Sequence, residues 1–137
     1  MKKIKNLFSI FMITFLFLMM GTSLAANTGD TSWSFNFGRT NFNLYTPSRE
    51  KQDASPIYFY VNNISGDTLK ARALAGNKQV TSYAPVYYIN KGGKYCISSN
   101  IHEDGYRTAL VHGSKYSTFS TLSASGLWSP DSWSCGW

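Results

Sequence analysis

The sequence has few of the residues from which metal centres and nucleophilic active sites are built. Among its 137 residues there are only two histidines and two cysteines. It contains no Cys-x-x-Cys or His-x-x-x-His pair, the spacings at which metal ligands usually occur. It also has no Gly-x-Ser-x-Gly nucleophile elbow. We therefore expect no metal site, no cofactor and no catalytic residues, and we expect that the protein is not an enzyme.

Carboxylates are scarce as well, with seven Asp and Glu residues in the whole chain. A glycosidase-like pair would require two of them to meet in space. Next to a histidine, Glu103 and Asp104 resemble a catalytic group, but a turn explains them better because turns favour Asp. His112 is expected to be a satisfied or partly buried side chain. The acids that folding could bring together are Glu50, Asp53, Glu103 and Asp131.

The chain has no apolar run long enough to span a membrane, which takes about 20 residues. Its main apolar run, Leu7 to Met20, carries no charge, follows the basic start Lys2-Lys3-Ile4-Lys5 and precedes the small residues Ser23 and Ala25. This order is typical of a secretory signal peptide. We expect a signal over residues 1–25, cleavage near Ala25 or Ala26, one secreted domain over 26–137, and no transmembrane anchor after cleavage.

A cluster of Lys and Arg is also absent, so nothing in the sequence indicates nucleic acid as a partner. Removing Lys2, Lys3 and Lys5 with the signal lowers the formal net charge from +6 to +3. A small positive charge on an exported domain favours anionic cell surfaces, although ordinary solubility accounts for it equally simply.

The two cysteines, Cys96 and Cys135, predict a disulfide, because an isolated pair in an exported protein meets an oxidising compartment. Such a bond would stabilise the fold by at most about 4 kcal/mol. The alternative is a pair of free thiols, one of them nucleophilic, but no surroundings that lower a thiol pKa are visible.

Alternating apolar and polar residues predict strands through most of the chain. Trp33, Phe35 and Phe37 alternate with polar or small residues, and no segment after the expected signal shows helical periodicity over three turns. These features predict an all-β fold: a small antiparallel β-sandwich, jelly-roll-like, with one disulfide. Besides this first strand, strand-like segments occur at 41–45, 57–61, 68–75, 86–89, 94–101 and 116–127, and 47–56 is expected to be a loop.

Asp104-Gly105 predicts a two-residue type I′ hairpin turn. In that register Glu103 pairs with Tyr106, and Cys96 leaves the hairpin on the side away from the core. We also expect Trp128 to be buried beside the hairpin. The face predicted to enter the core carries Tyr95, Ile97, Ile101, Thr108, Leu110 and His112.

Tyrosines are abundant, with nine in the chain, and those on predicted strands cannot all point inward. Amphipathic rings on a strand face suit sugar stacking or protein contact. Half-exposed tyrosines are also ordinary in small β proteins. The possible binding aromatics are Tyr58, Tyr60, Tyr87, Tyr88 and Tyr106.

Segments at 51–58, 95–98, 103–110 and 125–132 resemble a family of small signal-peptide-bearing proteins of Gram-positive bacteria, a domain of unknown function. The most specific element is a Gly-x-Trp-Ser-Pro-Asp-Ser motif formed here by Gly126, Trp128, Ser129, Pro130 and Asp131, followed by Ser132. The resemblance implies export and one fold but supplies no catalytic residues. Independently, Ser-Pro-Asp-Ser favours a turn in which the Asp side chain bonds its own backbone and the chain returns to the sheet.

A second resemblance is to lactococcin 972-type bacteriocins, through Thr31-Ser32-Trp33 and His112-Gly113-Ser114-Lys115. It implies action on the envelope of sensitive cells. The function that we favour is a secreted non-enzymatic binding or interaction module at the bacterial cell envelope, with an unidentified envelope component or surface protein as partner. The alternatives are a bacteriocin-like antibacterial protein and, third, a small secreted hydrolase.

Overall fold

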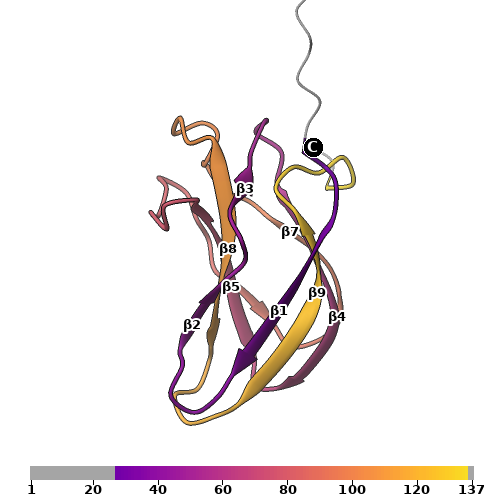
Figure 1. Ribbon diagram of the computed structural model, residues 1–137, viewed down its shortest axis with the longest axis vertical. Helices are drawn as coiled ribbons and strands as arrows, with labels where there is room; N and C mark the ends of the chain where they lie inside the picture. The colour runs from indigo at the N-terminus through magenta and orange to yellow at the C-terminus, as the bar shows by residue number, and fades with distance from the viewer. Residues whose placement is uncertain (1–26, 136–137) are drawn as a thin grey trace, which may run out of the picture.

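The computed structural model describes residues 27–135, which form two antiparallel sheets packed face to face (Figure 1). The first sheet has the order β1-β9-β4-β7, with β1 Thr31–Phe37, β9 Leu122–Ser129, β4 Ile57–Gly66 and β7 Gly93–Ile97. The second has the order β2-β8-β5-β6, with β2 Asn43–Tyr45, β8 Thr108–Lys115, β5 Leu69–Ala75 and β6 Tyr87–Ile89. A short β3, Arg49–Glu50, also pairs with β8. The predicted all-β sandwich is confirmed.

The N-terminal signal peptide predicted at residues 1–25 lies outside the described residues. Between residues 27 and 135 the structure contains no helix that is long and apolar enough to cross a membrane.

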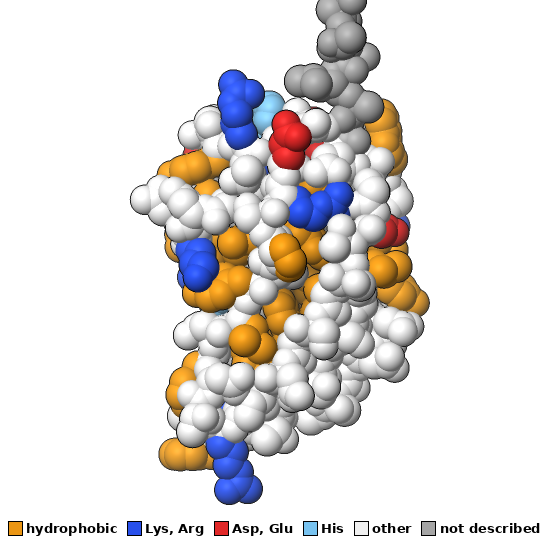
Figure 2. Space-filling model, in the orientation of Figure 1, with side chains coloured by type: hydrophobic (Ala, Val, Ile, Leu, Met, Phe, Trp, Pro, Cys, Tyr) orange, Lys and Arg blue, Asp and Glu red, His pale blue; other side chains and the backbone are white. Residues whose placement is uncertain are grey.

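The core lies between the sheets and combines aromatic side chains from the first with aliphatic ones from the second. From β1, Trp33, Phe35 and Phe37 point inward, and the Trp33 ring stacks on that of Phe59 with 4.4 Å between centroids. Facing them in the second sheet are mainly Leu69, Ala71, Ala73, Ile89, Ala109 and Val111. Figure 2 shows the face seen in Figure 1. Hydrophobic side chains are visible in its middle, and the charged side chains are separate from one another. The expected burial of Trp128 is confirmed, since its exposed fraction is 0%.

The hairpin predicted around Asp104-Gly105 is wrong. β7 pairs with β4 in the first sheet, whereas β8 pairs with β5 in the second. Between them the chain makes a helical turn that ends when Gly105 N–H donates to the His102 carbonyl and Tyr106 N–H to the Ile101 carbonyl. Gly105 has a φ of 85°, as expected of a glycine that ends a helical turn. A type I′ turn would also need a positive φ at Asp104, which the structure does not have.

The predicted core face is therefore right for the residues of β7 and the turn after it, and wrong for those of β8. Ile97 and Ile101 are buried in the core, but in β8 it is Ala109 and Val111 that face inward. Their register is set by β5, where Ala73 pairs with Val111, and not by β7. Only the β2–β3 and β5–β6 connections of the described chain stay within one sheet, so neighbouring strands in sequence are seldom neighbours in a sheet.

Several strand boundaries also differ from the prediction. β4 continues to Gly66, β7 ends at Ile97, and β9 begins only at Leu122. The segment 116–121 forms the β8–β9 loop, at the opposite end of the sandwich from the point where β9 ends (Figure 1).

Candidate functional site

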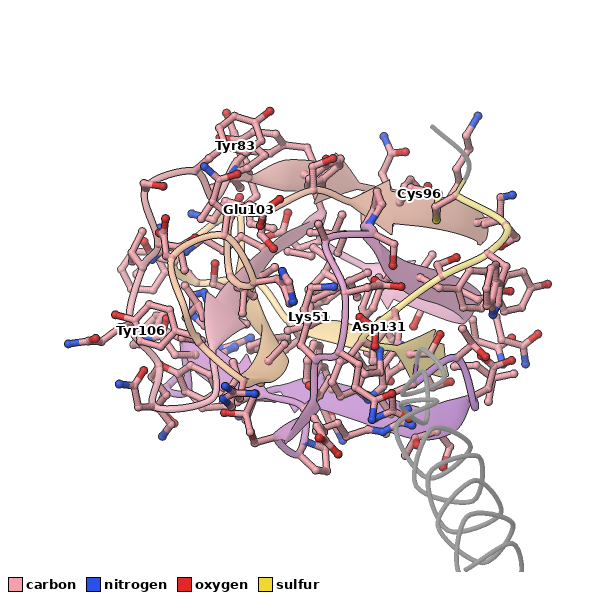
Figure 3. The ribbon with its side chains drawn as sticks, turned by 90° about the horizontal axis from the view of Figure 1, so that it is seen from above. Lys51, Tyr83, Cys96, Glu103, Tyr106 and Asp131 are labelled. Atoms are coloured by element: carbon pink, nitrogen blue, oxygen red, sulfur yellow. A yellow bond between two sulfur atoms is a disulfide. The ribbon has the colours of Figure 1, made fainter. Side chains whose placement is uncertain are left out.

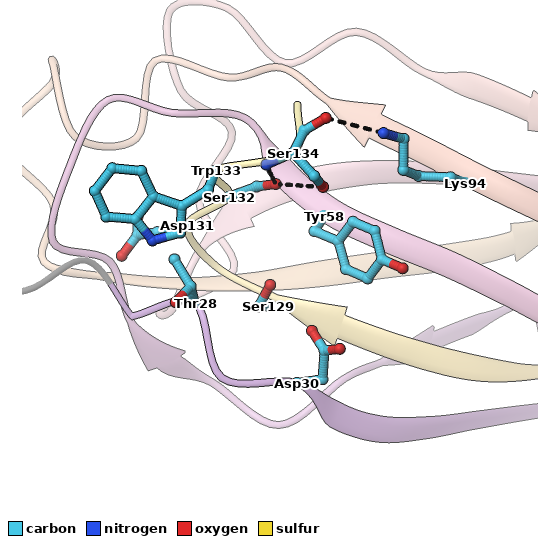
Figure 4. A pocket seen from close by; sticks show the side chains of 9 residues that line it. All are labelled: Thr28, Asp30, Tyr58, Lys94, Ser129, Asp131, Ser132, Trp133 and Ser134. Atoms are coloured by element: carbon cyan, nitrogen blue, oxygen red, sulfur yellow. Dashed lines mark hydrogen bonds between the residues drawn. The ribbon is translucent and has the colours of Figure 1, made fainter. Parts of the chain in front are cut away.

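A groove lies at the end of the first sheet, where the C-terminal segment folds over it (Figure 4). It encloses about 460 Å³. Trp133 stands at one end, and Tyr58 and Asp30 stand toward the other (Figure 4). The groove is lined by Thr28, Asp30, Tyr58, Lys94, Ser129, Asp131, Ser132, Trp133 and Ser134.

Trp133 is the most conspicuous of these side chains, because 80% of its surface is exposed. Tyr58, from β4, is half-buried. Burial raises the pKa of the Tyr58 hydroxyl, and the charges of Asp30 and Tyr60 add to the effect, so the phenol stays protonated and can donate a hydrogen bond. Lys94, from β7, donates to the Ser134 carbonyl at 2.9 Å, which ties the C-terminal segment to the sheet.

A disulfide fixes this segment beyond Trp133. Cys135 is bonded to Cys96 of β7, with 5.6 Å between the Cα atoms. The predicted pairing is confirmed, and no cysteine among residues 27–135 is free. Trp133 is thus held two residues before a covalent link to the sheet.

A buried ion pair fixes the segment on the other side of Trp133. The Lys51 ammonium donates to Asp131 Oδ1 at 2.9 Å, and both side chains are fully buried. Lys51 also donates to the carbonyls of Ser55 and Pro130, at 2.6 and 2.8 Å. All three of its protons therefore have acceptors. Figure 3 shows the two side chains together beneath the end of the sandwich.

The Asp131 carboxylate is equally well satisfied. Oδ2 accepts the backbone N–H groups of Asn27, at 2.8 Å, and of Gln52, at 3.0 Å. Burial raises the pKa of Asp131, but the bonds from Gln52, Lys51 and Asn27 and the charge of Lys51 outweigh it and hold the pKa below its usual value. The predicted bond from Asp131 to its own backbone is wrong: the carboxylate links three segments distant in sequence.

The residues of the Gly-x-Trp-Ser-Pro-Asp-Ser motif from Gly126 to Ser129 belong to β9, which forms part of the groove wall. A Cβ on Gly126 would lie 1.8 Å from the Tyr60 carbonyl oxygen, so only glycine fits at that point of β9. The same carbonyl and that of Leu127 accept the Trp33 indole N–H, at 3.3 and 3.2 Å. Ser129 closes the strand at the groove wall.

The predicted binding tyrosines do not form one surface. Tyr58 lines the groove, but Tyr88 lies on the outer face of the other sheet with 62% of its surface exposed. Tyr87 and Tyr106 pack against the core, where the Tyr87 hydroxyl accepts the Ser98 N–H and the Tyr106 hydroxyl donates to Gln79. Tyr60, on β4, is half-buried and does not line the groove.

Sequence reasoning missed Trp133, Asp30 and Lys94. The only signal for Trp133 was its position between Asp131 of the motif and Cys135 of the disulfide. Asp30 and Lys94 had none, because they lie in separate segments that only the fold brings together.

The carboxylates considered for a glycosidase pair are placed as follows. Glu103 lies away from Asp131, toward Tyr83 (Figure 3). The Asp53 N–H lies 3.4 Å from Asp131 Oδ1, but its own carboxylate accepts from Ser55. Asp131 is engaged with Lys51. Within the described ranges no group of three His, Cys, Asp or Glu residues is placed to hold a metal ion.

His112 behaves as expected, since it is half-buried and its Nε2 lies 2.8 Å from Asn43 Oδ1. Burial lowers the pKa of His112, and the charges of Arg72 and Lys70 lower it further.

Comparison with known proteins identifies the family of the chain but gives no function for it. No curated protein and no solved structure matches the chain. A family model described as a protein of unknown function, DUF2712, matches residues 21–132. The match takes in every strand of the sandwich and the Gly-x-Trp-Ser-Pro-Asp-Ser motif. The chain therefore belongs to the DUF2712 family of proteins of unknown function.

Proposed function

We propose that the protein is an exported, non-enzymatic binding module of the bacterial cell envelope, and that its C-terminal groove binds a sugar chain there. The observation that carries this proposal is Trp133. A side chain of this size, 80% exposed, gains nothing for folding. Yet the segment that presents it is fixed by a disulfide on one side and a buried ion pair on the other.

The groove has the composition of a carbohydrate site. An indole ring offers a flat apolar face for the C–H face of a sugar. Around it are groups that exchange hydrogen bonds with sugar hydroxyls: the Asp30 carboxylate as acceptor, the Tyr58 phenol as donor, and the hydroxyls of Thr28 and Ser132 as either. An apolar platform with a few placed polar groups is the usual pattern of a ligand site.

Export is supported by two independent features. The Leu7–Met20 run after a basic start is typical of a signal peptide. The Cys96–Cys135 bond needs an oxidising compartment to form and persist. Together they support a location outside the membrane, where the sugar polymers of the envelope are found.

Replacing Trp133 by alanine is expected to weaken sugar binding about tenfold or more, because it removes the aromatic platform on which the sugar stacks. The probe is a set of soluble glycan strands released from purified Gram-positive cell walls, and the measurement is a calorimetric titration of the oxidised protein.

Phe119→Ala is the matched control. Phe119 is 85% exposed, but it lies in the β8–β9 loop at the other end of the sandwich, where Lys115 holds the neighbouring carbonyls of Thr118 and Ser120. This variant should bind as the unsubstituted protein does. Equal binding by the Trp133 and Phe119 variants, or no binding by the unsubstituted protein, would contradict the proposal.

A further inference from the structure

The outer face of the second sheet carries a cluster of basic side chains in a shallow groove of about 280 Å³. Lys70 and Arg72 occupy alternate positions of β5, so they point to the same side. In the sheet register His112 of β8 lies opposite Arg72, and Tyr88 of β6 lies opposite Lys70. Three strands thus contribute to one depression.

No acidic side chain balances this cluster. The side chains of Lys70 and Arg72 form neither a salt bridge nor a hydrogen bond to any residue between 27 and 135. The charged groups around His112 are Arg72 and Lys70 on β5. On β2 the imidazole meets Asn43, whose Oδ1 lies 2.8 Å from Nε2, and Tyr45, whose ring centroid lies 5.0 Å from its own. Over the Tyr45 ring lies a further cation, Lys78, at 4.3 Å.

This arrangement does not help the protein to fold. Like charges on neighbouring positions of a sheet repel each other, and nothing in the described fold compensates them. The groove wall is mixed in character, because it includes the Ser114 hydroxyl as well as Val86 and the exposed Tyr88 ring. The face therefore presents two cationic hydrogen-bond donors, Lys70 and Arg72, beside the ring of Tyr88.

We infer that this groove is an anion-binding site for an envelope polymer whose repeating units are joined by phosphodiesters. The guanidinium fork of Arg72 matches two phosphate oxygens, and the Lys70 ammonium serves as a point charge. Residues two apart on a strand are about 7 Å apart. The two cations are therefore placed to meet successive anionic groups of a chain rather than one isolated anion.

This site is separate from the sugar groove beside Trp133. It uses the outer face of the other sheet and shares no lining residue with that groove. The two proposals can fail independently, because Trp133→Ala leaves the basic cluster intact and substitutions on β5 leave Trp133 intact.

The double variant Lys70→Gln/Arg72→Gln is expected to bind poly(glycerol phosphate) about tenfold or more weakly than the unsubstituted protein, in a calorimetric titration at 0.15 M salt. The control is Arg39→Gln/Lys91→Gln, which removes the same charge from exposed positions elsewhere. It should weaken binding by about twofold or less, because distant exposed charges are largely screened at this salt.

Three results would overturn the inference. An equal loss in both double variants would show that net charge alone attracts the polymer. No binding by the unsubstituted protein would remove the site. Binding to phosphatidylglycerol vesicles but not to poly(glycerol phosphate) would assign the face to a membrane surface.

His112 supplies a further check on the position of the polymer. Lowering the pH from 7.5 through the lowered pKa of His112 should strengthen binding, since protonation adds a positive charge beside Arg72. His112→Gln should remove this dependence. A pH dependence that is unchanged in the His112 variant would place the bound polymer elsewhere.

Discussion

Asp131→Asn is expected to lower the free energy of unfolding by about 3–5 kcal/mol, a large part of the stability of a domain of this size. The substitution leaves the Lys51 ammonium buried without its counter-ion. The new amide N–H₂ group donates hydrogen bonds, but the groups that surround it are donors as well. It would face either the Lys51 ammonium or the N–H groups of Asn27 and Gln52. Urea unfolding followed by tryptophan fluorescence measures the loss.

The same pair should show coupling and a pH signature. Because Lys51 and Asp131 stabilise each other, the Lys51→Met/Asp131→Asn double variant should lose about 1–3 kcal/mol less than the sum of the two single variants. The pKa of Asp131 is lowered by folding, so its contribution is present above about pH 4, where the unfolded carboxyl ionises, and is lost as the pH falls further. Asp131→Asn should reduce this acid-dependent loss.

Glu103→Gln is the control, since it makes the same acid-to-amide change at an exposed position. It should alter stability by about 0.5 kcal/mol or less. If Asp131→Asn were as mild as Glu103→Gln, the ion pair would not be what fixes the C-terminal segment.

Gly126→Ala is expected to cost about 4 kcal/mol or more, or to prevent folding. A Cβ at this position would overlap the Tyr60 carbonyl, which is backbone and cannot move aside without breaking the β4–β9 pairing. It would also disturb the Trp33 indole, which donates to that carbonyl. The signal to follow is the near-ultraviolet circular dichroism, which reports fixed tryptophan environments.

Gly29→Ala provides the comparison. Gly29 is exposed, and the nearest atom to an added Cβ would be Nη2 of Arg49, 3.9 Å away. That variant should keep the native spectrum and unfold within about 0.5 kcal/mol of the unsubstituted protein. A native spectrum and native stability for Gly126→Ala would mean that β4 and β9 do not approach as closely as described.

The strands and the disulfide could be predicted from the sequence because they rest on local or unambiguous signals. The alternation of Trp33, Phe35 and Phe37 places these rings on one face whatever they pack against. With only two cysteines, Cys96 and Cys135 have one possible intramolecular pairing. Neither prediction needed knowledge of which strands are neighbours.

Strand pairing and the site could not be predicted, because both depend on contacts between distant segments. Asp104-Gly105 has the sequence of a hairpin turn, but the glycine instead ends a helical turn that carries the chain from one sheet to the other. Lys51 and Asp131 are 80 residues apart, and neither has a sequence context typical of a buried charge. Trp133 has no periodic partner that would show whether it is buried or exposed.

The most direct test of the proposed envelope binding through Trp133 is co-sedimentation of the oxidised protein with intact Gram-positive cells at low and at high salt. We predict that the unsubstituted protein sediments at both salt concentrations, because stacking on a sugar is insensitive to ionic screening, and that Trp133→Ala stays in the supernatant at high salt. Retention only at low salt, or equal retention of the Trp133 variant at high salt, would contradict the account.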